Sequence, residues 1–303
     1  MTFDVRRDAP PAPAASGLTR RGLIKAGLGL TGLAGVVAPG TAAYAAMEAA
    51  NGLSITDYRL SPPGWRAGQR LTITAIADIH AGGPNMGIER VRQVVDAANA
   101  LGSDLTVLLG DYFATHRFVT ERVPHPAWAA ELARLKAPLG VFATLGNHDW
   151  WHDGEAVRQA LGKAGITVLE NAAVPLPTAA GPLWLVGIGD DMTGHAQPEK
   201  AFSGIPAEAR LIVMMHDPAN APALPARSLV AFAGHAHGGQ VRLPVFGALL
   251  TPGRAPRQHA YGWLSDVPAP TFVTAGVGTS ILPVRFNCPP ETVVLRLSGK
   301  ESS

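Results

Sequence analysis

The chain has 303 residues, of which 47% are hydrophobic and 16% charged, and its formal net charge is +2. This composition supplies a sizeable core and excludes a collagen, a coiled coil, an acidic disordered tail and a multi-span membrane protein. The single cysteine, Cys288, excludes an internal disulfide. Residues 1–45 hold five basic and two acidic side chains, which leaves 20 basic and 21 acidic ones elsewhere. Because the remainder has no basic excess, we expect no nucleic-acid partner.

The N-terminus carries the pattern of an export signal. Residues 19–25 read TRRGLIK, which resembles the twin-arginine export signal, and an Ala-Tyr-Ala triplet at 43–45 matches a small-x-small cleavage site. We therefore predict that residues 1–45 engage the twin-arginine export machinery and that residues 46–303 form the remaining domain. Two other interpretations stay open. One is an uncleaved membrane anchor, since residues 26–47 carry no charge and are nearly long enough to span a bilayer, and the other is a chance Arg pair before a structural helix.

Beyond residue 50, short apolar strands alternate with amphipathic stretches. Predicted strands cover residues 71–77, 105–109, 141–145, 183–188, 211–215, 229–233, 271–275 and 292–297. Predicted helices cover residues 88–101, 128–135 and 155–164. Strand–helix–strand units come first and strands joined by loops follow, without an internal repeat or a long linker. The pattern predicts a single α/β domain whose sheet is partly parallel.

Polar side chains that can bind metal follow five of these predicted strands. They are Asp78 with His80, Asp111, Asn147 with His148 and Asp149, His216, and His235 with His237. Ligands of open α/β sheets gather beyond the carboxyl ends of the strands, so we expect these side chains at one edge. Asp oxygens and neutral His nitrogens are ligands for zinc, manganese or iron, and one carboxylate can bridge two cations. Two cations roughly 3.5–4 Å apart could clamp both ends of an in-line displacement at phosphorus.

Each of these motifs has an ordinary structural explanation when it stands alone. A Gly-Asp pair after a strand marks a turn, a single histidine such as His216 is commonly a hydrogen-bonded core residue, and GHAHGG at 234–239 could be a surface turn. What indicates a metal site is that all of them occur, in order, each at the end of an apolar run.

The ordered set Asp-x-His, Gly-Asp, Gly-Asn-His-Asp, His, Gly-His-x-His resembles the calcineurin-like metallophosphoesterase superfamily. GHAHGGQ at 234–240 is similar to the GHTHGGQ segment of twin-arginine-exported bacterial phosphodiesterases, a branch related to UDP-2,3-diacylglucosamine hydrolases. GVGTSILPVRFNCPP at 276–290 is similar to that branch's closing segment. The resemblance covers residues 55–297 and implies an α/β fold of two mixed β-sheets packed as a sandwich and flanked by helices.

The resemblance also implies a role for each side chain. The first metal would be bound by Asp78, His80 and His237, the second by Asn147, His216 and His235, and both by Asp111. His148 would not bind metal but would donate a hydrogen bond to a phosphoryl oxygen or a proton to the leaving group. Asp149 would orient His148. The implied cofactors are two divalent metal ions, whether manganese, zinc or iron. Ala77 and Ala236 stand where the family commonly has Ser and Thr, and neither is a ligand position.

The implied function is that of a metal-dependent phosphoric ester hydrolase. Attack by a metal-bound hydroxide would cleave a phosphodiester or pyrophosphate bond without a phosphoenzyme. We expect a phosphate-ester substrate in the periplasm or cell envelope, with lipid or cell-wall linkage and membrane association both left open. One alternative is a membrane-associated UDP-2,3-diacylglucosamine pyrophosphohydrolase in lipid A synthesis. Another is a non-catalytic cell-envelope binding protein on the same scaffold.

Three features near the predicted site each allow two interpretations. Trp150 and Trp151 would line an apolar entrance or pack against the following helix. Arg285 would contact phosphate or form a surface salt bridge. Asp190 and Asp191 would lie near the substrate or cap a turn.

Overall fold

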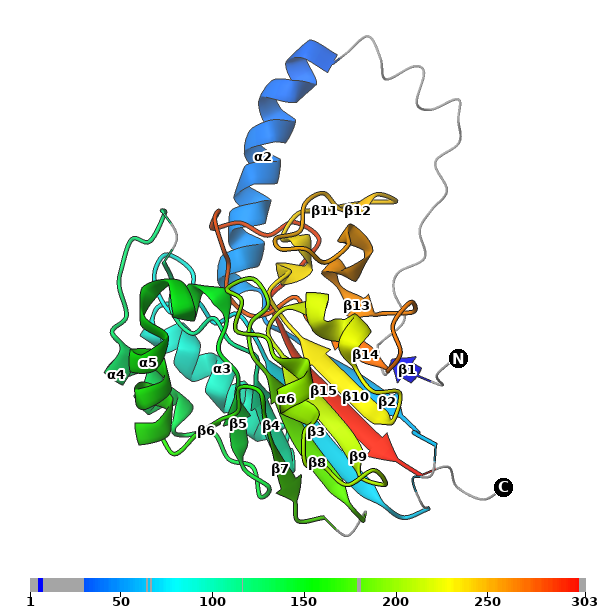
Figure 1. The fold of residues 1–303 in the computed structure, drawn as a ribbon. Coiled ribbons are helices and arrows are strands. Elements are labelled where there is room, and N and C mark those ends of the chain that lie inside the picture. The colour runs from blue at the N-terminus through cyan, green and yellow to red at the C-terminus, as the bar shows by residue number, and fades with distance from the viewer. Residues whose placement is uncertain are drawn as a thin grey trace.

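Two β-sheets pack face to face, and helices cover the outer face of each sheet (Figure 1). The computed structural model describes residues 5–7, 30–63, 65, 67–115, 117–178 and 181–299. The predicted class, an α/β sandwich of two mixed sheets flanked by helices, is confirmed.

The first sheet has seven strands. Their spatial order is β1 (Val5–Arg7), β2 (Ser54–Leu60), β15 (Glu291–Ser298), β3 (Arg70–Ile76), β4 (Leu105–Leu108), β5 (Val141–Ala143) and β6 (Thr167–Val168). The strands from β3 to β6 run parallel, whereas β15 is antiparallel to β3 and parallel to β2. The C-terminal strand β15 is therefore inserted between β2 and β3, so strands from both ends of the domain lie side by side in this sheet.

The second sheet has six strands. Their order is β13 (Gly262–Trp263), β14 (Thr271–Val273), β10 (Ser228–Ala233), β9 (Arg210–Met215), β8 (Leu183–Ile188) and β7 (Ala172–Leu176). The four central strands are parallel, and β7 and β13 are antiparallel edges. A separate hairpin joins β11 (Arg242–Leu243) to β12 (Gly247–Ala248).

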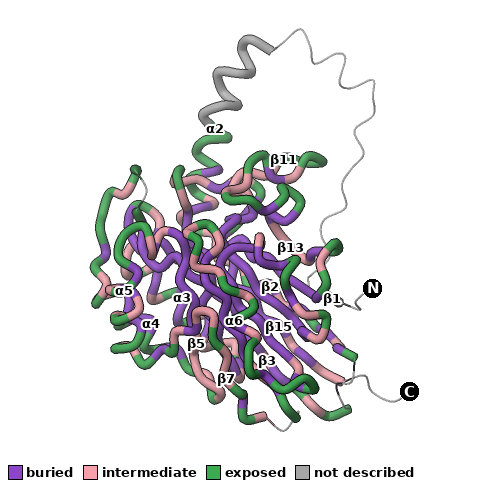
Figure 2. Tube along the Cα trace, viewed as in Figure 1, coloured by how far each residue is buried: buried purple, intermediate pink, exposed green. Residues whose placement is uncertain are grey.

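The main core lies between the two sheets. Ile73 and Val107 of the first sheet meet Ile212 and Phe232 of the second, and each is at most 1% exposed. Figure 2 shows that the central strands are buried along most of their length. Because both faces of each sheet are covered, the strands are nearly uninterrupted apolar runs, of which LTITAI in β3 is an example.

Helices complete the outer layers. The first sheet is covered by α3 (Ile88–Ala100), α4 (His125–Leu132) and α5 (Asn147–Lys163). The second is covered by α6 (Pro198–Phe202) and the 3₁₀ helix η2 (Pro218–Ala223). Apolar residues at helical spacing explain α3, which buries Val91, Val94, Val95 and Ala98. Helix α5 begins at Asn147, well before the predicted start at 155, and bends at Asp153.

Helix α2 (Leu30–Asn51) projects from one end of the sandwich and packs on it through its last turns (Figure 1). Ala45 and Ala49 are buried there, and the Ala45 carbonyl accepts a hydrogen bond from the Arg285 backbone N–H at 2.9 Å. The predicted cleavage triplet at 43–45 lies within this helix.

The twin-arginine motif itself lies outside the described residues, since the structure does not describe residues 8–29. Within the described part of the chain, no helix combines the length and apolarity that a membrane crossing requires. Export by the twin-arginine route stays a prediction.

Candidate metal centre

The carboxyl ends of strands from both sheets meet at one edge of the sandwich. The loop after β3 is joined to the loop after β4 by a hydrogen bond from Asp78 N to Gly110 O at 3.1 Å. The loops after β9 and β10 are joined by Gly234 N and His216 O at 3.0 Å. Between the sheets, His235 N donates to the Asp78 carboxylate at 3.0 Å. This is the edge at which the sequence predicted a site.

Five of the seven predicted ligands have a left-handed backbone. The angle φ is 55° at Asp78, 44° at His80, 57° at Asp111, 65° at His235 and 50° at His237. This conformation costs a residue with a side chain about 1–2 kcal/mol, so the surrounding fold must hold it. It turns the chain sharply at each strand end, which aims successive ligands into one pocket. Strain concentrated at these positions is typical of a functional site.

Two glycines allow the ligand loops to approach one another closely. A Cβ atom on Gly110, where φ is +93°, would lie 2.6 Å from the Gly146 nitrogen and 2.9 Å from His216 Nδ1. A Cβ atom on Gly146 would collide with the Asp111 carboxylate. The glycines of the Gly-Asp and Gly-Asn-His-Asp motifs are therefore required by the spacing of the loops.

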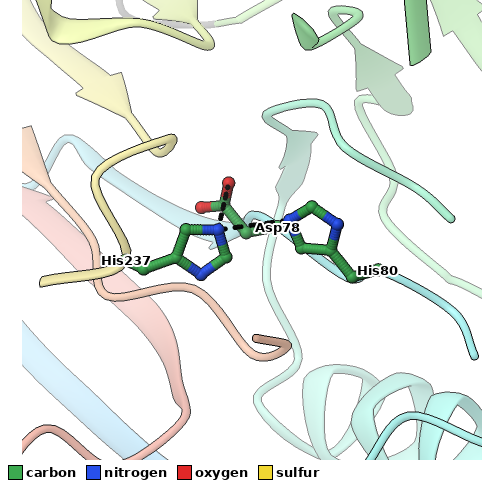
Figure 3. Close-up of side chains that lie close together, drawn as sticks. All are labelled: Asp78, His80 and His237. Atoms are coloured by element: carbon green, nitrogen blue, oxygen red, sulfur yellow. Dashed lines mark hydrogen bonds and ion pairs between the residues drawn. The ribbon is translucent and has the colours of Figure 1, made fainter. Parts of the chain in front are cut away.

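Asp78, His80 and His237 form the first cluster of ligands (Figure 3). The Nε2 atoms of His80 and His237 are 3.1 Å apart, and Asp78 Oδ1 lies 3.6 Å from His237 Nε2. All three side chains are buried. One carboxylate and two imidazoles thus face a common point, as expected for the first metal.

Asn147, His216 and His235 form a second cluster beside the first. His216 Nε2 is 3.0 Å from Asn147 Oδ1 and 3.1 Å from His235 Nδ1. Asp111 Oδ2 lies 3.3 Å from the same His216 atom and 3.5 Å from His80 Nε2. A single carboxylate oxygen therefore stands between the two clusters, and the structure brings all seven predicted ligands together.

Burial shifts the pKa of four side chains in and beside the two clusters. It raises the pKa of Asp78 to about 7, and with repulsion from Asp111 it raises the pKa of Asp149 to about 8. Burial also lowers the pKa of His235 to about 3 and, with the neighbouring imidazoles, holds the pKa of His237 well below its usual range. His235 and His237 are therefore neutral at pH 7, which is the form that can bind a metal.

The donor set fits a pair of divalent cations. Buried carboxylates need compensating charge, and the Asp78 and Asp111 side chains are both almost fully buried. Imidazole nitrogens that face each other at 3.1 Å need a proton or a cation between them. Four imidazoles, two carboxylates and an amide oxygen are ligands that zinc, manganese and iron accept.

His148 lies at the rim of the site rather than within a cluster. Its backbone N–H donates to Asp111 Oδ1 at 2.9 Å, and its half-buried ring stands edge-on to that of His80, with centroids 4.8 Å apart. The ring is held by Thr115 Oγ1 at Nδ1 and by Ser280 Oγ at Nε2, the latter at 3.3 Å. This position is suited to a group that contacts the substrate.

Asp149 does not make the predicted contact with the His148 ring. Its Oδ2 accepts hydrogen bonds from Asp111 N at 2.8 Å and Gly146 N at 2.9 Å, and its Oδ1 accepts one from Tyr112 N at 2.9 Å. The Asp149 side chain therefore holds the two ligand loops together. The orienting role predicted for Asp149 falls instead to Thr115 and Ser280, which sequence reasoning missed; only Ser280 had a signal, its place in the 276–290 segment.

Sequence reasoning also missed Asp217, which lies behind His235. Asp217 Oδ2 is 3.9 Å from His235 Nε2, both side chains are buried, and neither atom has a hydrogen-bond partner within the described residues. Because His235 Nδ1 faces His216, a carboxylate at Nε2 would favour the tautomer that leaves Nδ1 free for a metal. The one available signal was that Asp217 directly follows His216.

We expect the Asp217→Asn variant to bind metal about 10- to 100-fold more weakly while it stays folded. Asparagine keeps the oxygen that accepts from the Ala219 N–H at 2.8 Å but loses the negative charge behind His235. Calorimetric titration of metal-stripped protein with Mn²⁺ measures the change. The matched control, Asp266→Asn, removes the carboxylate beside the buried His259 and should leave the affinity unchanged. Wild-type affinity in Asp217→Asn would exclude this role.

Arg285 takes neither of the roles that the sequence left open. Its side chain is fully buried and donates hydrogen bonds to backbone carbonyls. The acceptors are Ala275, Gly276, Gly278 and Cys288, at 2.6–3.1 Å. The guanidinium therefore holds the 275–288 segment around itself and has no exposed surface with which to contact a substrate or a surface acid.

The two tryptophans differ in their surroundings. Trp150 is half-buried; its ring stacks on that of His195 with centroids 3.7 Å apart, and its N–H donates to Glu170 at 3.1 Å. Trp151 is 60% exposed, and its ring centroid is 5.0 Å from that of His148. Trp151 therefore borders the site, and Trp150 supports the fold.

The acidic pair at 190–191 has structural partners. Asp190 Oδ2 accepts from the backbone N–H and the hydroxyl of Thr193, at 2.8 and 2.7 Å. Asp191 forms an ion pair with Arg254, with an oxygen 2.6 Å from Nη2. The turn-capping interpretation is thus the one that describes Asp190.

A two-sheet sandwich with paired Asp, His and Asn clusters at its strand ends defines a metallophosphoesterase. The model of the calcineurin-like phosphoesterase family matches residues 71–281, and the chain belongs to this family. It is a phosphoric ester hydrolase of a metal-dependent family.

The chain is similar to two bacterial relatives. It is 29% identical over 215 residues to YkuE of Bacillus subtilis (strain 168), described as an uncharacterized metallophosphoesterase, and the match covers 70% of this chain and 74% of YkuE. It is 32% identical over 214 residues to phosphodiesterase YaeI of Escherichia coli (strain K12), covering 67% of this chain and 75% of YaeI. A solved structure, the 5'-nucleotidase precursor from Thermus thermophilus, matches with a TM-score of 0.45 and 14% identity, over 69% of this chain and half of that one.

Proposed function

We propose that this protein hydrolyses a phosphodiester or pyrophosphate bond with the help of two divalent cations. The observation that carries the proposal is Asp111 Oδ2, which lies 3.5 Å from His80 Nε2 and 3.3 Å from His216 Nε2 and so between the two clusters. When bound, two cations would activate a water and neutralise charge on the phosphoryl oxygens. The diester preference is supported by the similarity to phosphodiesterase YaeI.

The chain's own groups position the reaction. His148 stands beside the bridging carboxylate, where its imidazole can donate a hydrogen bond to a phosphoryl oxygen or a proton to the leaving oxygen. Ser280 and Thr115 hold the ring in place, and Trp151 screens its outer edge. Asp149 fixes the loop that carries Asp111.

Metal dependence tests the proposal directly. Metal-stripped protein should be inactive on bis-p-nitrophenyl phosphate, and Mn²⁺ should restore turnover. Turnover of the diester should exceed that of p-nitrophenyl phosphate. Metal binding without turnover of either ester or of a pyrophosphate-containing substrate would favour the alternative of a non-catalytic binding protein.

We expect His148→Gln to lower kcat by about 10²- to 10⁴-fold without changing metal content. If His148 donates a proton, the loss should be larger for a phenyl ester than for a p-nitrophenyl ester, because phenolate is the poorer leaving group. The matched control is His152→Gln, an exposed histidine on the same helix, which should keep wild-type kcat. Equal kcat in both variants would remove His148 from the reaction.

The location in the cell envelope is part of the proposal and rests on the twin-arginine pattern at residues 19–25. Residues 1–50 fused to a reporter that works only outside the cytoplasm should give active reporter, and Arg20→Lys with Arg21→Lys should abolish it. A reporter retained inside would favour the alternative of a cytoplasm-facing UDP-2,3-diacylglucosamine pyrophosphohydrolase.

A further inference from the structure

An exposed apolar surface is formed by the β11–β12 hairpin loop, the residues that follow it and a neighbouring loop. We call it the apolar face; its members are Val245, Phe246, Leu249, Leu250, Ile281 and Leu282. The most exposed are Val245 at 102%, Leu250 at 80%, Phe246 at 71% and Ile281 at 69%. Figure 2 shows this hairpin as an exposed projection at one end of the molecule. Large apolar side chains gathered in solvent mark a docking surface.

Hydrogen bonds join the two loops into one surface. The Gln240 side chain accepts from Ser280 N at 2.5 Å and donates to Leu282 O at 3.0 Å. The root of the hairpin pairs with the same segment through Arg242 N and Phe286 O at 2.9 Å. The apolar side chains are therefore presented outward by a hydrogen-bonded frame.

Helix α2 leaves the domain at the same end. The Tyr44 ring meets the Phe286 ring edge-on, with centroids 5.6 Å apart, and Tyr44 and Met47 are 46% and 62% exposed. Figure 1 shows α2 projecting from the end of the sandwich that carries β11 and β12. Phe286 lies in the same 276–290 segment as Ile281 and Leu282, so the last turns of α2 contact the segment that carries part of the apolar face.

The segment that carries most of the apolar face is basic, and Asp266 follows directly after it. Residues 241–265 contain Arg242, Arg254 and Arg257 and no Asp or Glu. Arg254 is paired with Asp191, whereas Arg242 lies over an aromatic ring and Arg257 is exposed. Apolar side chains rimmed by arginines match an anionic lipid headgroup layer, which attracts the charge and accepts the side chains below it.

We propose that the apolar face docks on an anionic lipid bilayer, with Val245 and Phe246 inserted below the headgroups. Arg257 then lies at the level of the lipid phosphates. Because Ser280 contacts His148 and precedes Ile281, docking turns the rim of the metal centre toward the membrane surface. This interaction is independent of which phosphate ester the site cleaves.

An environment-sensitive fluorophore at position 245 tests the docking in the full-length protein. Val245→Cys is labelled with a nitrobenzoxadiazole reagent; Cys288 is buried, and burial raises the pKa of its thiol, so it reacts slowly. Vesicles of phosphatidylglycerol and phosphatidylcholine should shift the emission to the blue. Pure phosphatidylcholine vesicles should shift it less, and high salt should reduce the shift. The matched control is label at Glu208→Cys, which is exposed at the opposite end of β9 from the site and should show no shift.

Two further substitutions decide whether the apolar face itself inserts. Phe246→Ser with Leu250→Ser should abolish the shift at position 245, whereas Phe118→Ser, an exposed phenylalanine elsewhere, should not. Turnover of bis-p-nitrophenyl phosphate without vesicles should be the same in all variants, which separates this test from that of the hydrolase. No shift with vesicles, or an equal shift at position 208, would overturn the proposal. A blue emission before lipid is added would also overturn it. If that emission depended on protein concentration, a second copy of the chain would cover the apolar face. If it did not, the chain's own N-terminal segment would cover it.

Discussion

Asp111→Asn is expected to lower kcat/KM by at least about 10³-fold, the largest effect of any single change in the site. The amide has the same shape and can still accept from the His148 N–H, as Asp111 Oδ1 does at 2.9 Å. It carries no charge, however, and its NH₂ group would face His80 and His216, both of which are needed as ligands. Turnover of bis-p-nitrophenyl phosphate and metal content per chain measure the two consequences together.

The control for this variant is Asp104→Asn. Asp104 also accepts a backbone hydrogen bond, from Thr72 N at 2.7 Å, but it lies at the opposite end of β4 from Asp111. It should retain wild-type turnover and two metal ions per chain. Wild-type turnover in Asp111→Asn would contradict the bridging role and with it the dinuclear site.

Arg285→Met is expected to destabilise the fold by about 4 kcal/mol, because it leaves buried carbonyls unpaired at a cost of about 1–3 kcal/mol each. Methionine fills much of the same volume, so lost hydrogen bonds dominate the effect. The affected carbonyls belong to the 275–288 segment, which lies against Asp78: Gly278 N donates to Asp78 O at 2.8 Å. Chemical denaturation of metal-free protein measures the free energy of unfolding without a contribution from metal.

Arg134→Met serves as the comparison. Arg134 is 43% exposed and pairs with Glu131 and Asp96 on the surface, so its loss should cost less than about 1 kcal/mol. If Arg285→Met were as stable as Arg134→Met but had a raised KM, the phosphate-contact interpretation would be restored.

The ligands could be predicted from the sequence because each ends an apolar strand. In β9, for example, RLIVMM has no polar side chain after its first residue, so His216 stands out as the first group able to do chemistry. The rule that ligands gather at the carboxyl ends of strands then places it with His235. What no pattern revealed was the left-handed backbone at five of these positions, since it depends on contacts between loops far apart in the chain.

The role of Asp149 could not be predicted, because neighbours in sequence are not neighbours on a helix. His148 and Asp149 lie in the first turn of α5, where successive side chains point about 100° apart. His148 therefore faces the rim while Asp149 turns back to the loop nitrogens. The beginning of α5 was missed because NHDWWHD at 147–153 has no helical period of apolar residues.

Strand β2 and the burial of Arg285 were missed for related reasons. In β2 the inward positions are Thr56, Tyr58 and Leu60, and Thr56 is held inside by a 2.6 Å hydrogen bond to Glu291. A polar residue on the buried side conceals the alternation that marks a strand. Arg285 is also a polar residue that is buried. Residue type alone therefore predicts that both Thr56 and Arg285 lie on the surface.

The ligands are divided between the two sheets: Asp78 and Asp111 follow strands of the first, and His216 and His235 follow strands of the second. A cation held by ligands from both sheets links the two sheets, and it binds only the folded chain. At a free concentration 100 times its dissociation constant, the cation adds about 2.7 kcal/mol to the free energy of unfolding. The melting temperature therefore rises with the metal concentration, and a protease cleaves the metal-free protein sooner than the metal-bound protein.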